Sequence, residues 1–548
     1  MRLDAIFRNG RFTTLDPRRP TASAVGVFGG RIIGLDADLD GCTAAFEADL
    51  GGAPVVPGFN DAHHHLSLRG QRLLELDVRT DVVPTLDALY EAVRKRAAEL
   101  PEGAWIHGSG YDQNKIGAHP TADALDAVSG GRPVWLQHCS GHMGVANSAA
   151  FALAGLADRT AVPDVPGGHV ERDTDGRATG LLQESAQSLV RTVFRPAPME
   201  DYIAGIAEAC RVGLSEGLTS ATEPGIGTTA VGNGPADLHG FLTARERGLL
   251  GMRMTVMPYV TALRDAGAFE PGGDWFGLDL GLRTGMGDER LRIGPTKILS
   301  DGSLIGRSAA MCHEYHDDPG NSGFFIFEAE ELRRMIVEAH RCGWQVATHA
   351  IGDSAVESVL DAYAEAQRRH PREDVRHRIE HCGMASDAQV ARIAGLGVVP
   401  VPQGRFVSEI GDGMARALGP RARLAYRMRA FLDAGVVLPG STDCPVVAGA
   451  PLASMHDMVN RRTASGAPFT PEEAVTPEEA LRAYTIGSAY AVHEEQVKGT
   501  LTPGKLADFV VLSDDPLAVA PERIRDIGVG ATVVGGTVAY DGGAVAGV

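Results

Sequence analysis

The chain has 548 residues, of which 44% are hydrophobic, and its formal net charge is −19. Nucleic acids and anionic membranes repel so acidic a chain at long range, so we expect neither as a partner. The start lacks an apolar signal segment and no run of about 18 uncharged apolar residues occurs, so a cytoplasmic protein is expected. Seven cysteines without a C-x-x-C pair are typical of reduced thiols, which agrees with that compartment.

The chain begins and ends in short β-rich segments separated by glycine-containing turns. Strands are predicted over 2–9, 22–28 and 31–35, and again near the other end of the sequence over 508–512, 527–534 and 537–540. We expect the two ends to pair into one small β domain made of residues 1–57 and 499–548.

A further predicted strand, 53–60, leads into three consecutive histidines. Side chains at i and i+2 share one face of a strand, so His63 and His65 converge while His64 turns away. Neutral imidazole is a common ligand of divalent metals, and the pair forms half of a metal site. Taken alone, three adjacent histidines fit a solvated loop equally well.

Residues 67–182 are too many for one connecting helix. They contain a predicted helix at 86–100, strand-like pieces at 105–108 and 134–138, and a hairpin signal at 171–177. We interpret 67–182 as an insertion over the mouth of the main domain, where it would serve as a lid or a substrate wall. A simple packing extension is the alternative.

The remaining sequence alternates apolar strand-like runs with alanine-rich helical stretches, which favours a parallel sheet or an α/β barrel. Together with 53–60 there are eight such runs, the number of strands in a (β/α)8 barrel. Functional side chains of these barrels lie where strands meet the following loops, and Lys297, His349, His381 and Asp443 hold such positions. The other seven runs are 218–223, 252–260, 291–300, 345–349, 377–381, 398–402 and 436–441.

Motifs along nearly the whole chain resemble those of the amidohydrolase superfamily, and in particular amidohydrolase family 3, the branch that contains N-substituted formamide deformylase. They are Pro57-Gly58-Phe59-Asn60-Asp61-Ala62-His63-His64-His65, Ser140-Gly141-His142-Met143-Gly144-Val145-Ala146-Asn147-Ser148, Thr179-Gly180-Leu181-Leu182-Gln183-Glu184, Lys297-Ile298-Leu299-Ser300-Asp301-Gly302-Ser303, His349-Ala350-Ile351-Gly352-Asp353, Ile379-Glu380-His381-Cys382, Ser441-Thr442-Asp443-Cys444-Pro445 and Gly499-Thr500-Leu501-Thr502-Pro503-Gly504-Lys505-Leu506-Ala507-Asp508.

The resemblance implies a metal-dependent hydrolase on a (β/α)8 TIM-like barrel, spanning 58–498, with a β-sandwich built from both termini. It implies one or two divalent metals per chain, most simply zinc. His63 and His65 would hold the more buried metal, and His349 and His381 the more exposed one. Lys297 would be N6-carbamylated and would bridge the two metals.

Lys297 poses an electrostatic problem that is independent of the resemblance. An ammonium group beside two divalent cations in a dry site is strongly unfavourable, so this lysine must be neutral, displaced or chemically altered. The alternative is an unmodified lysine paired with Asp301 or with a substrate carboxylate.

Asp443 is the candidate catalytic residue as well as a candidate metal ligand. It would bind the buried metal, take a proton from the attacking hydroxide and pass it to the leaving nitrogen. A lone aspartate after a strand is otherwise an N-cap or a loop hydrogen-bonding group.

Five further residues are candidates for substrate binding. Asp112 and His142 lie in motifs of the insertion, and Glu184 lies where the insertion rejoins the main domain, although a glutamate at a helix start commonly faces solvent. Ser303 and Arg307 follow Lys297, although a loop arginine is commonly a surface group. At Cys444 the chain departs from the branch, in which a bulky aromatic residue is common, and this changes the expected pocket shape.

We therefore expect a metal-dependent amidohydrolase that cleaves an amide, N-formyl or cyclic amide C–N bond by attack of metal-bound hydroxide. Two alternatives remain open: a single-metal hydrolase of another amide or ester with Lys297 unmodified, and a non-catalytic metal-binding regulatory protein of the same fold. The expected partner is a small-molecule substrate, and a homodimer is a candidate assembly.

Overall fold

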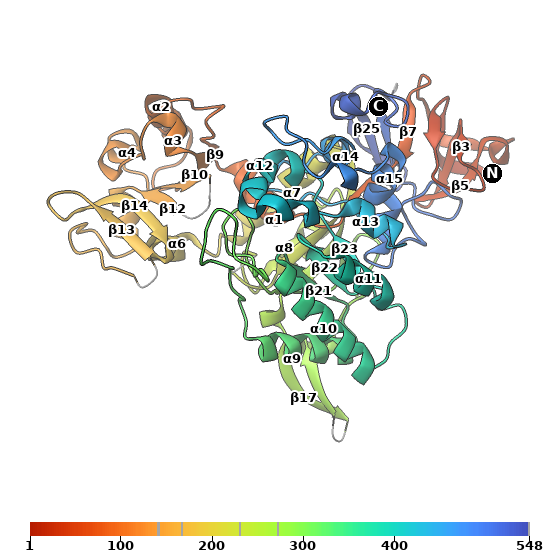
Figure 1. Cartoon of the computed structure of the whole chain (residues 1–548). Coiled ribbons are helices and arrows are strands. Elements are labelled where there is room, and N and C mark those ends of the chain that lie inside the picture. Colours follow the sequence, from red (N-terminus) through yellow and green to blue (C-terminus); the bar gives the residue numbers. More distant parts are fainter. Residues whose placement is uncertain (140–142, 166–167, 230–231, 271–272, 546–548) are drawn as a thin grey trace. The chain divides into compact units, whose positions relative to one another are not determined.

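A computed structural model describes residues 1–139, 143–165, 168–229, 232–270 and 273–545 (Figure 1). The chain divides into two compact units, unit 1 with Met1–Leu66 and Cys210–Val548, and unit 2 with Ser67–Ala209. In the described part of the chain, no helix has the length and apolar character needed to cross a membrane.

Both ends of the chain build two β-sheets within unit 1. The core between these sheets contains Phe7, Phe12 and Phe509, and the ring of Phe509 meets the other two edge-on at centroid distances of 4.9 Å and 5.9 Å. Such aromatic pairs add to the burial that holds the sheets together. The first sheet has the order β5(Arg31–Leu35)-β4(Val25–Phe28)-β1(Arg2–Arg8)-β6(Thr43–Asp49), and the second has the order β26(Thr537–Asp541)-β25(Val529–Val534)-β24(Phe509–Leu512)-β7(Pro54–Pro57)-β2(Arg11–Thr13)-β3(Thr21–Ala22).

The predicted strand 53–60 is two strands, and in this respect the prediction was wrong. β7 pairs antiparallel with β24, whereas β8 (Phe59–Asp61) pairs parallel with β15 (Leu218–Ile226). Gly58 lies at the switch between the two sheets, where a Cβ atom would come within 2.3 Å of the Thr219 hydroxyl. The chain changes sheets here because only glycine permits this approach.

The centre of unit 1 is an α/β arrangement with two parallel four-stranded sheets. An isolated bridge between Tyr259 and Lys297 links the two sheets. Their strands are buried almost throughout, as expected for parallel sheets covered on both faces. One sheet has the order β19(Leu291–Ile293)-β16(Arg253–Pro258)-β15(Leu218–Ile226)-β8, and the other has the order β20(Thr296–Leu299)-β21(Val346–Ala350)-β22(Arg378–His381)-β23(Val399–Val401).

The eighth predicted run, 436–441, does not form a strand, which corrects the prediction. Pro439 has no N–H to donate, and the Gly440 N–H donates to the Ala483 carbonyl at 2.8 Å, so a regular ladder cannot form. The segment nevertheless follows β8, because the Ala62 N–H donates to the Gly440 carbonyl at 2.9 Å and the Asp443 N–H donates to the His63 carbonyl at 2.8 Å.

Helices alternate with the strands of unit 1, and a short hairpin, β17 (Arg264–Glu270) and β18 (Gly273–Gly277), follows β16. In α11 (Asp387–Leu396) the Ser386 hydroxyl caps the helix start by accepting from the Gln389 N–H, and Gly397 ends the helix in the left-handed conformation. The helices outside unit 2 are α8(Asp237–Glu246), α9(Ala329–Arg341), α10(Asp353–Arg369), α11(Asp387–Leu396), α12(Phe406–Leu418), α13(Met428–Asp433), α14(Pro451–Asn460), α15(Pro477–Arg482) and α16(Ser488–Tyr490).

Unit 2 is a six-stranded mixed sheet with helices. Its strand order is β13(Gly168–Arg172)-β14(Ala178–Glu184)-β12(Met143–Ala146)-β11(Val134–His138)-β10(Ile106–Tyr111)-β9(Leu76–Asp77). The predicted helix 86–100, strand 134–138 and hairpin near 171–177 correspond to α2, β11 and the β13–β14 pair. The helices that begin in this region of the sequence are α1(Leu66–Leu74), α2(Leu86–Glu99), α3(Gln113–Ile116), α4(Ala122–Val128), α5(Ser148–Leu153), α6(Ser188–Phe194) and α7(Met199–Ser215).

Candidate functional site

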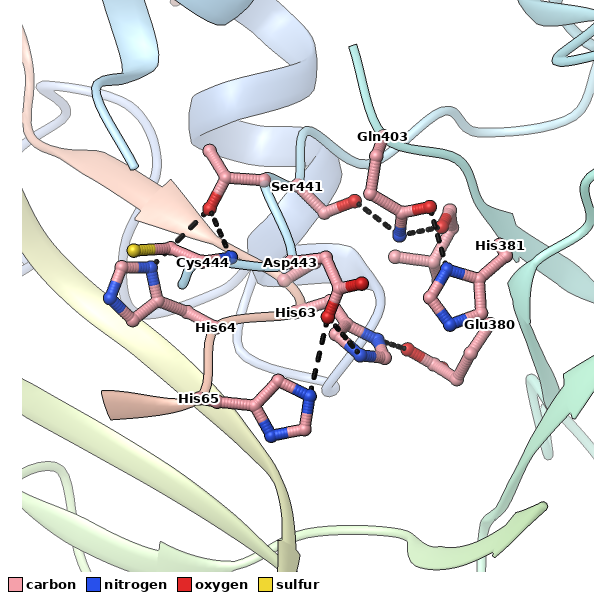
Figure 2. A network of polar contacts seen from close by, with 12 residues as sticks. His63, His64, His65, Glu380, His381, Gln403, Ser441, Asp443 and Cys444 are labelled. Carbon is pink, nitrogen blue, oxygen red and sulfur yellow. Dashed lines mark hydrogen bonds and ion pairs between the residues drawn. The ribbon is translucent and has the colours of Figure 1, made fainter. Parts of the chain in front are cut away.

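His63, His65 and Asp443 converge at one point in unit 1 (Figure 2). The His63 Nε2 and His65 Nε2 atoms lie 3.3 Å and 3.2 Å from Asp443 Oδ1. One ligand atom from each residue lies within 4.8 Å of the others, a spacing that one metal ion can span after slight contraction. His63 and His65 follow β8, and the backbone bonds described above hold Asp443 beside them.

His64 turns away from this point, as predicted (Figure 2), although the three histidines follow β8 and do not lie within it. The His64 Nδ1 atom lies 3.0 Å from Asp61 Oδ2. The same carboxylate accepts from the Thr442 backbone N–H at 3.1 Å and from the Thr442 hydroxyl at 2.5 Å. Asp61 therefore ties the histidine segment to the segment that carries Asp443.

Glu380 is a buried carboxylate that orients His63, and the sequence analysis did not single it out. The His63 Nδ1–H donates to Glu380 Oε2, which leaves Nε2 to face Asp443. Burial alone would raise the pKa of Glu380, but the Arg378 guanidinium, bonded to it at 2.7 Å and 2.9 Å, holds the pKa far below its usual value. Glu380 is thus a carboxylate at neutral pH, and it fixes the His63 tautomer.

His349 and His381 lie beside His63. The His381 ring centroid is 4.5 Å from that of His349 and 4.9 Å from that of His63. His381 Nδ1–H donates to Gln403 Oε1 at 2.7 Å, and His349 Nε2–H donates to the Gly302 carbonyl at 3.0 Å. Burial lowers the pKa of His349 to about 3 and that of His381 well below 6.5, so both rings are neutral.

Two residues of the site have strained backbones. His381 has φ +69° and Asp443 has φ +61°, values in the left-handed region that non-glycine residues rarely adopt. Each such residue costs roughly 1–3 kcal/mol, and such strain concentrates at functional sites.

Lys297, on β20, is 2% exposed. Burial lowers the pKa of its amine to about 8, although the charges of Glu380 and Asp443 oppose this shift. The Asp301 carboxylate accepts the backbone N–H groups of Ala310, Ile351 and Gly352 at 2.8–3.0 Å, and no ion pair joins it to Lys297 among the described residues. This geometry counts against the alternative in which Asp301 neutralises the lysine.

The Asp443 carboxylate is ionised. Burial by itself would raise its pKa, but hydrogen bonds with His63 and His65 outweigh burial and hold the pKa well below its usual value. A carboxylate in this state can bind a cation or accept a proton from a reacting group.

The donor set fits a divalent metal. With its Nδ1 bonded to Glu380, His63 directs Nε2 at Asp443 Oδ1, 3.3 Å away, where a divalent cation can take the place of the proton that makes the hydrogen bond. Two lone pairs facing each other in a buried site repel unless a cation or proton lies between them. An imidazole held through its other nitrogen by a carboxylate is also the usual arrangement around protein-bound metals.

The four candidate substrate-binding residues that the structure describes divide between the two units. Ser303 accepts the Gly306 N–H at 3.1 Å, and Arg307 pairs with Asp317 and donates to nearby carbonyls, so both stabilise their own loop. Asp112 and Glu184 belong to unit 2, where Glu184 is exposed at the end of β14. His142 lies outside the described residues.

The comparisons with known proteins agree with this chemistry. The amidohydrolase family model matches residues 47–540. N-substituted formamide deformylase of Arthrobacter pascens is 32% identical over 98% of both chains, and the protein LONG AFTER FAR-RED 3 of Arabidopsis thaliana is 31% identical over 98% of this chain and 91% of its own. The crystal structure of an uncharacterized metal-dependent hydrolase from Pyrococcus furiosus matches with a TM-score of 0.76 and 30% identity over 94% of this chain and 99% of that one.

The chain belongs to the amidohydrolase family. It is a metal-dependent hydrolase that acts on carbon–nitrogen bonds other than peptide bonds.

Proposed function

We propose that this enzyme hydrolyses a small amide, N-formyl compound or cyclic amide. The observation that carries the proposal is the convergence of His63, His65 and Asp443. Glu380 fixes the orientation of His63 through a hydrogen bond to its Nδ1. A divalent metal bound there would polarise the substrate carbonyl and lower the pKa of water from 15.7 to about 7. Asp443 would take the proton of that water and deliver it to the leaving nitrogen.

For the metal we propose zinc, with one or two ions per chain. His63, His65 and Asp443 would hold the more buried ion, and His349 and His381, whose rings are neutral, the more exposed one. An amine with a pKa of about 8 is partly neutral near pH 7, and a neutral amine can react with carbon dioxide. We therefore place a carbamate on Lys297, which would convert a cation into a bridging carboxylate.

We propose a closed (β/α)8 barrel over 58–498. The Tyr259–Lys297 bridge joins the two parallel sheets at one side, and the contacts of 440–444 with 62–65 support closure on the other. In the same proposal, residues 1–57 and 499–548 form the composite β-sandwich, and 67–182 form an insertion that acts as a lid. None of the seven cysteines, all of which the structure describes, forms a disulfide, which supports a reducing compartment such as the cytoplasm, and a homodimer remains a candidate assembly.

The first substrates to test are N-substituted formamides, because the deformylase relative acts on them by its name and aligns over 98% of this chain. Purified protein should be stripped with a chelator, reloaded with zinc and assayed for amine formation from formamides and cyclic amides and for acid release from esters. We expect hydrolysis that is lost on stripping and returns with metal.

The alternatives predict other results in the same assay. Full turnover with one metal equivalent and no mass increase on Lys297 would favour the single-metal enzyme. A metal-loaded protein that hydrolyses none of these substrates would favour the non-catalytic regulatory protein.

A further inference from the structure

Unit 2 contains a second group of side chains that can bind a metal, at the carboxyl ends of two neighbouring parallel strands. Tyr111, the last residue of β10, lies opposite His138, the last residue of β11. Asp112 and Cys139 directly follow these strand ends. One ligand atom from each of Asp112, His138 and Cys139 lies within 4.8 Å of the others. Oxygen, nitrogen and sulfur donors brought together in this way suit a transition metal.

The His138 ring is held in an orientation that fits metal binding. Its side chain is buried, and the Nε2–H donates to the Gln113 side-chain carbonyl at 2.6 Å, so Nδ1 is the ring nitrogen on the side away from Gln113. Histidines that bind metals are commonly fixed through the other nitrogen in this manner. The Cys139 sulfur lies 3.8 Å from His138 Nδ1 and 3.7 Å from Nε2, and a sulfur and a nitrogen ligand of a tetrahedral zinc are separated by about 3.6 Å.

We propose that Asp112, His138 and Cys139 bind one divalent transition metal of the zinc class within unit 2. This centre is additional to the one at His63, His65 and Asp443. Three protein ligands leave a fourth position for water or another small ligand, as in open zinc sites. The Lys115 ammonium is 3.9 Å from Asp112 Oδ2, but its side chain is 68% exposed, so it can move into solvent when a divalent cation binds.

Cobalt(II) provides a direct test, because a thiolate ligand gives cobalt an intense near-ultraviolet charge-transfer band that nitrogen and oxygen ligands do not. The full-length protein, stripped of metal under reducing conditions, is titrated with cobalt chloride. We expect the band to grow to saturation at one equivalent of thiolate-bound cobalt. A titration without the band overturns the proposal.

Variants assign the band to its residues. Cys139→Ser should abolish it and remove one equivalent of bound cobalt, and Asp112→Asn should weaken cobalt binding at this centre by about 10-fold or more, since a charged ligand is lost. Cys312→Ser is the matched control, because Cys312 is also exposed and outside any disulfide.

Two buried cysteines need separate controls, because Cys382 follows His381 and Cys444 follows Asp443. If the band survives Cys139→Ser and disappears in Cys382→Ser or Cys444→Ser, the thiolate belongs to the other centre and the proposal is wrong. A His63→Ala variant should lose hydrolysis and keep the band, so failure of the proposed catalytic centre is distinguishable from failure of this one.

Discussion

Asp443 is placed to serve two purposes, and a single substitution separates them. Asp443→Asn keeps the volume and one ligating oxygen but removes the base. We expect the protein to fold, to keep much of its metal and to lose turnover by about 10²–10⁴-fold, the usual contribution of a positioned acid–base group. Metal analysis and steady-state kinetics on the same preparation check both parts, and near-parental turnover would show that another group moves the proton.

Glu380 acts on the metal through His63, so its effect should appear in metal affinity. Glu380→Gln keeps a hydrogen-bond acceptor for His63 but removes the charge, and the loss of such a partner typically lowers metal affinity 10–100-fold. Competition with a chromogenic chelator measures this change.

The same substitution leaves the buried Arg378 without its carboxylate, which destabilises the fold by about 3–5 kcal/mol if no new partner forms. The melting temperature must therefore be recorded for each Glu380 variant. An Arg378→Met/Glu380→Gln double variant removes both charges and serves as the control. Unchanged metal affinity in a folded variant would contradict an orienting role for Glu380.

Lys297 tests the proposed carbamate. Lys297→Ala should lose activity and metal, because the bridging group disappears. Acetate or propionate added to the variant should restore part of both, since a small carboxylate can occupy the vacated space. The carbamate would be excluded if chloride restored activity and metal binding as well as acetate does. It would also be excluded if the metal-replete native protein, measured near neutral pH, carried no added mass on Lys297.

At the scale of single elements, Gly58 marks the point where the chain leaves one sheet for another. Gly58→Ala would place a Cβ 2.3 Å from the buried Thr219 hydroxyl, so we expect a destabilisation of roughly 1–3 kcal/mol, as for other overpacked cores. Gly395→Ala in α11 is the matched control, because a Cβ there meets nothing within 4 Å and should stabilise by about 0.4–1 kcal/mol. Thermal melts of the two variants should shift in opposite directions, and equal shifts would refute the steric argument.

The sequence predicts elements best where local pattern and pairing agree. β11 was predicted over 134–138 and is observed as Val134–His138, because its apolar run is bounded by polar residues and turns. The run 436–441 has the same apolar character but forms no strand, since Pro439 and Gly440 direct its backbone bonds elsewhere. Composition alone does not distinguish these two outcomes.

At the candidate site, the histidines and Asp443 could be predicted because they follow apolar runs that end at one edge of the fold. Glu380 and Gln403 could not, because their roles depend on contacts with His63 and His381 across 317 and 22 residues of sequence. Glu380 lies beside a predicted ligand and within a motif that resembles the family, but neither signal indicates its contact with His63.

At the scale of the whole molecule, a buried bidentate ion pair connects the terminal sheets to the parallel strands of unit 1. Arg253, on β16, donates to Asp508 at 2.6 Å and 2.9 Å, and Asp508 immediately precedes β24. Deletion of 508–548 would remove this carboxylate and open the edge of β7. We expect the shortened chain to aggregate, because the edge of β7, which is normally covered by β24, becomes exposed and can pair with other chains.

Co-expression of residues 499–548 as a separate peptide supplies the control for that deletion. The peptide carries β24, β25 and β26, so it should restore solubility by pairing with β7. A shortened chain that is soluble and active without the peptide would contradict the expectation.

The pairing of β7 with β24 also affects how the protein folds during its synthesis on the ribosome. β7 emerges early, but its partner is synthesised about 450 residues later, and at about 5–20 residues per second this delay is on the order of a minute. During that time the incomplete terminal sheets expose apolar side chains such as Phe7 and Phe12, because Phe509 has not yet been made. Pulse-labelled nascent chains should therefore remain protease-sensitive in their first 57 residues until the last strands leave the exit tunnel, and they should be clients of chaperones that bind unfolded segments.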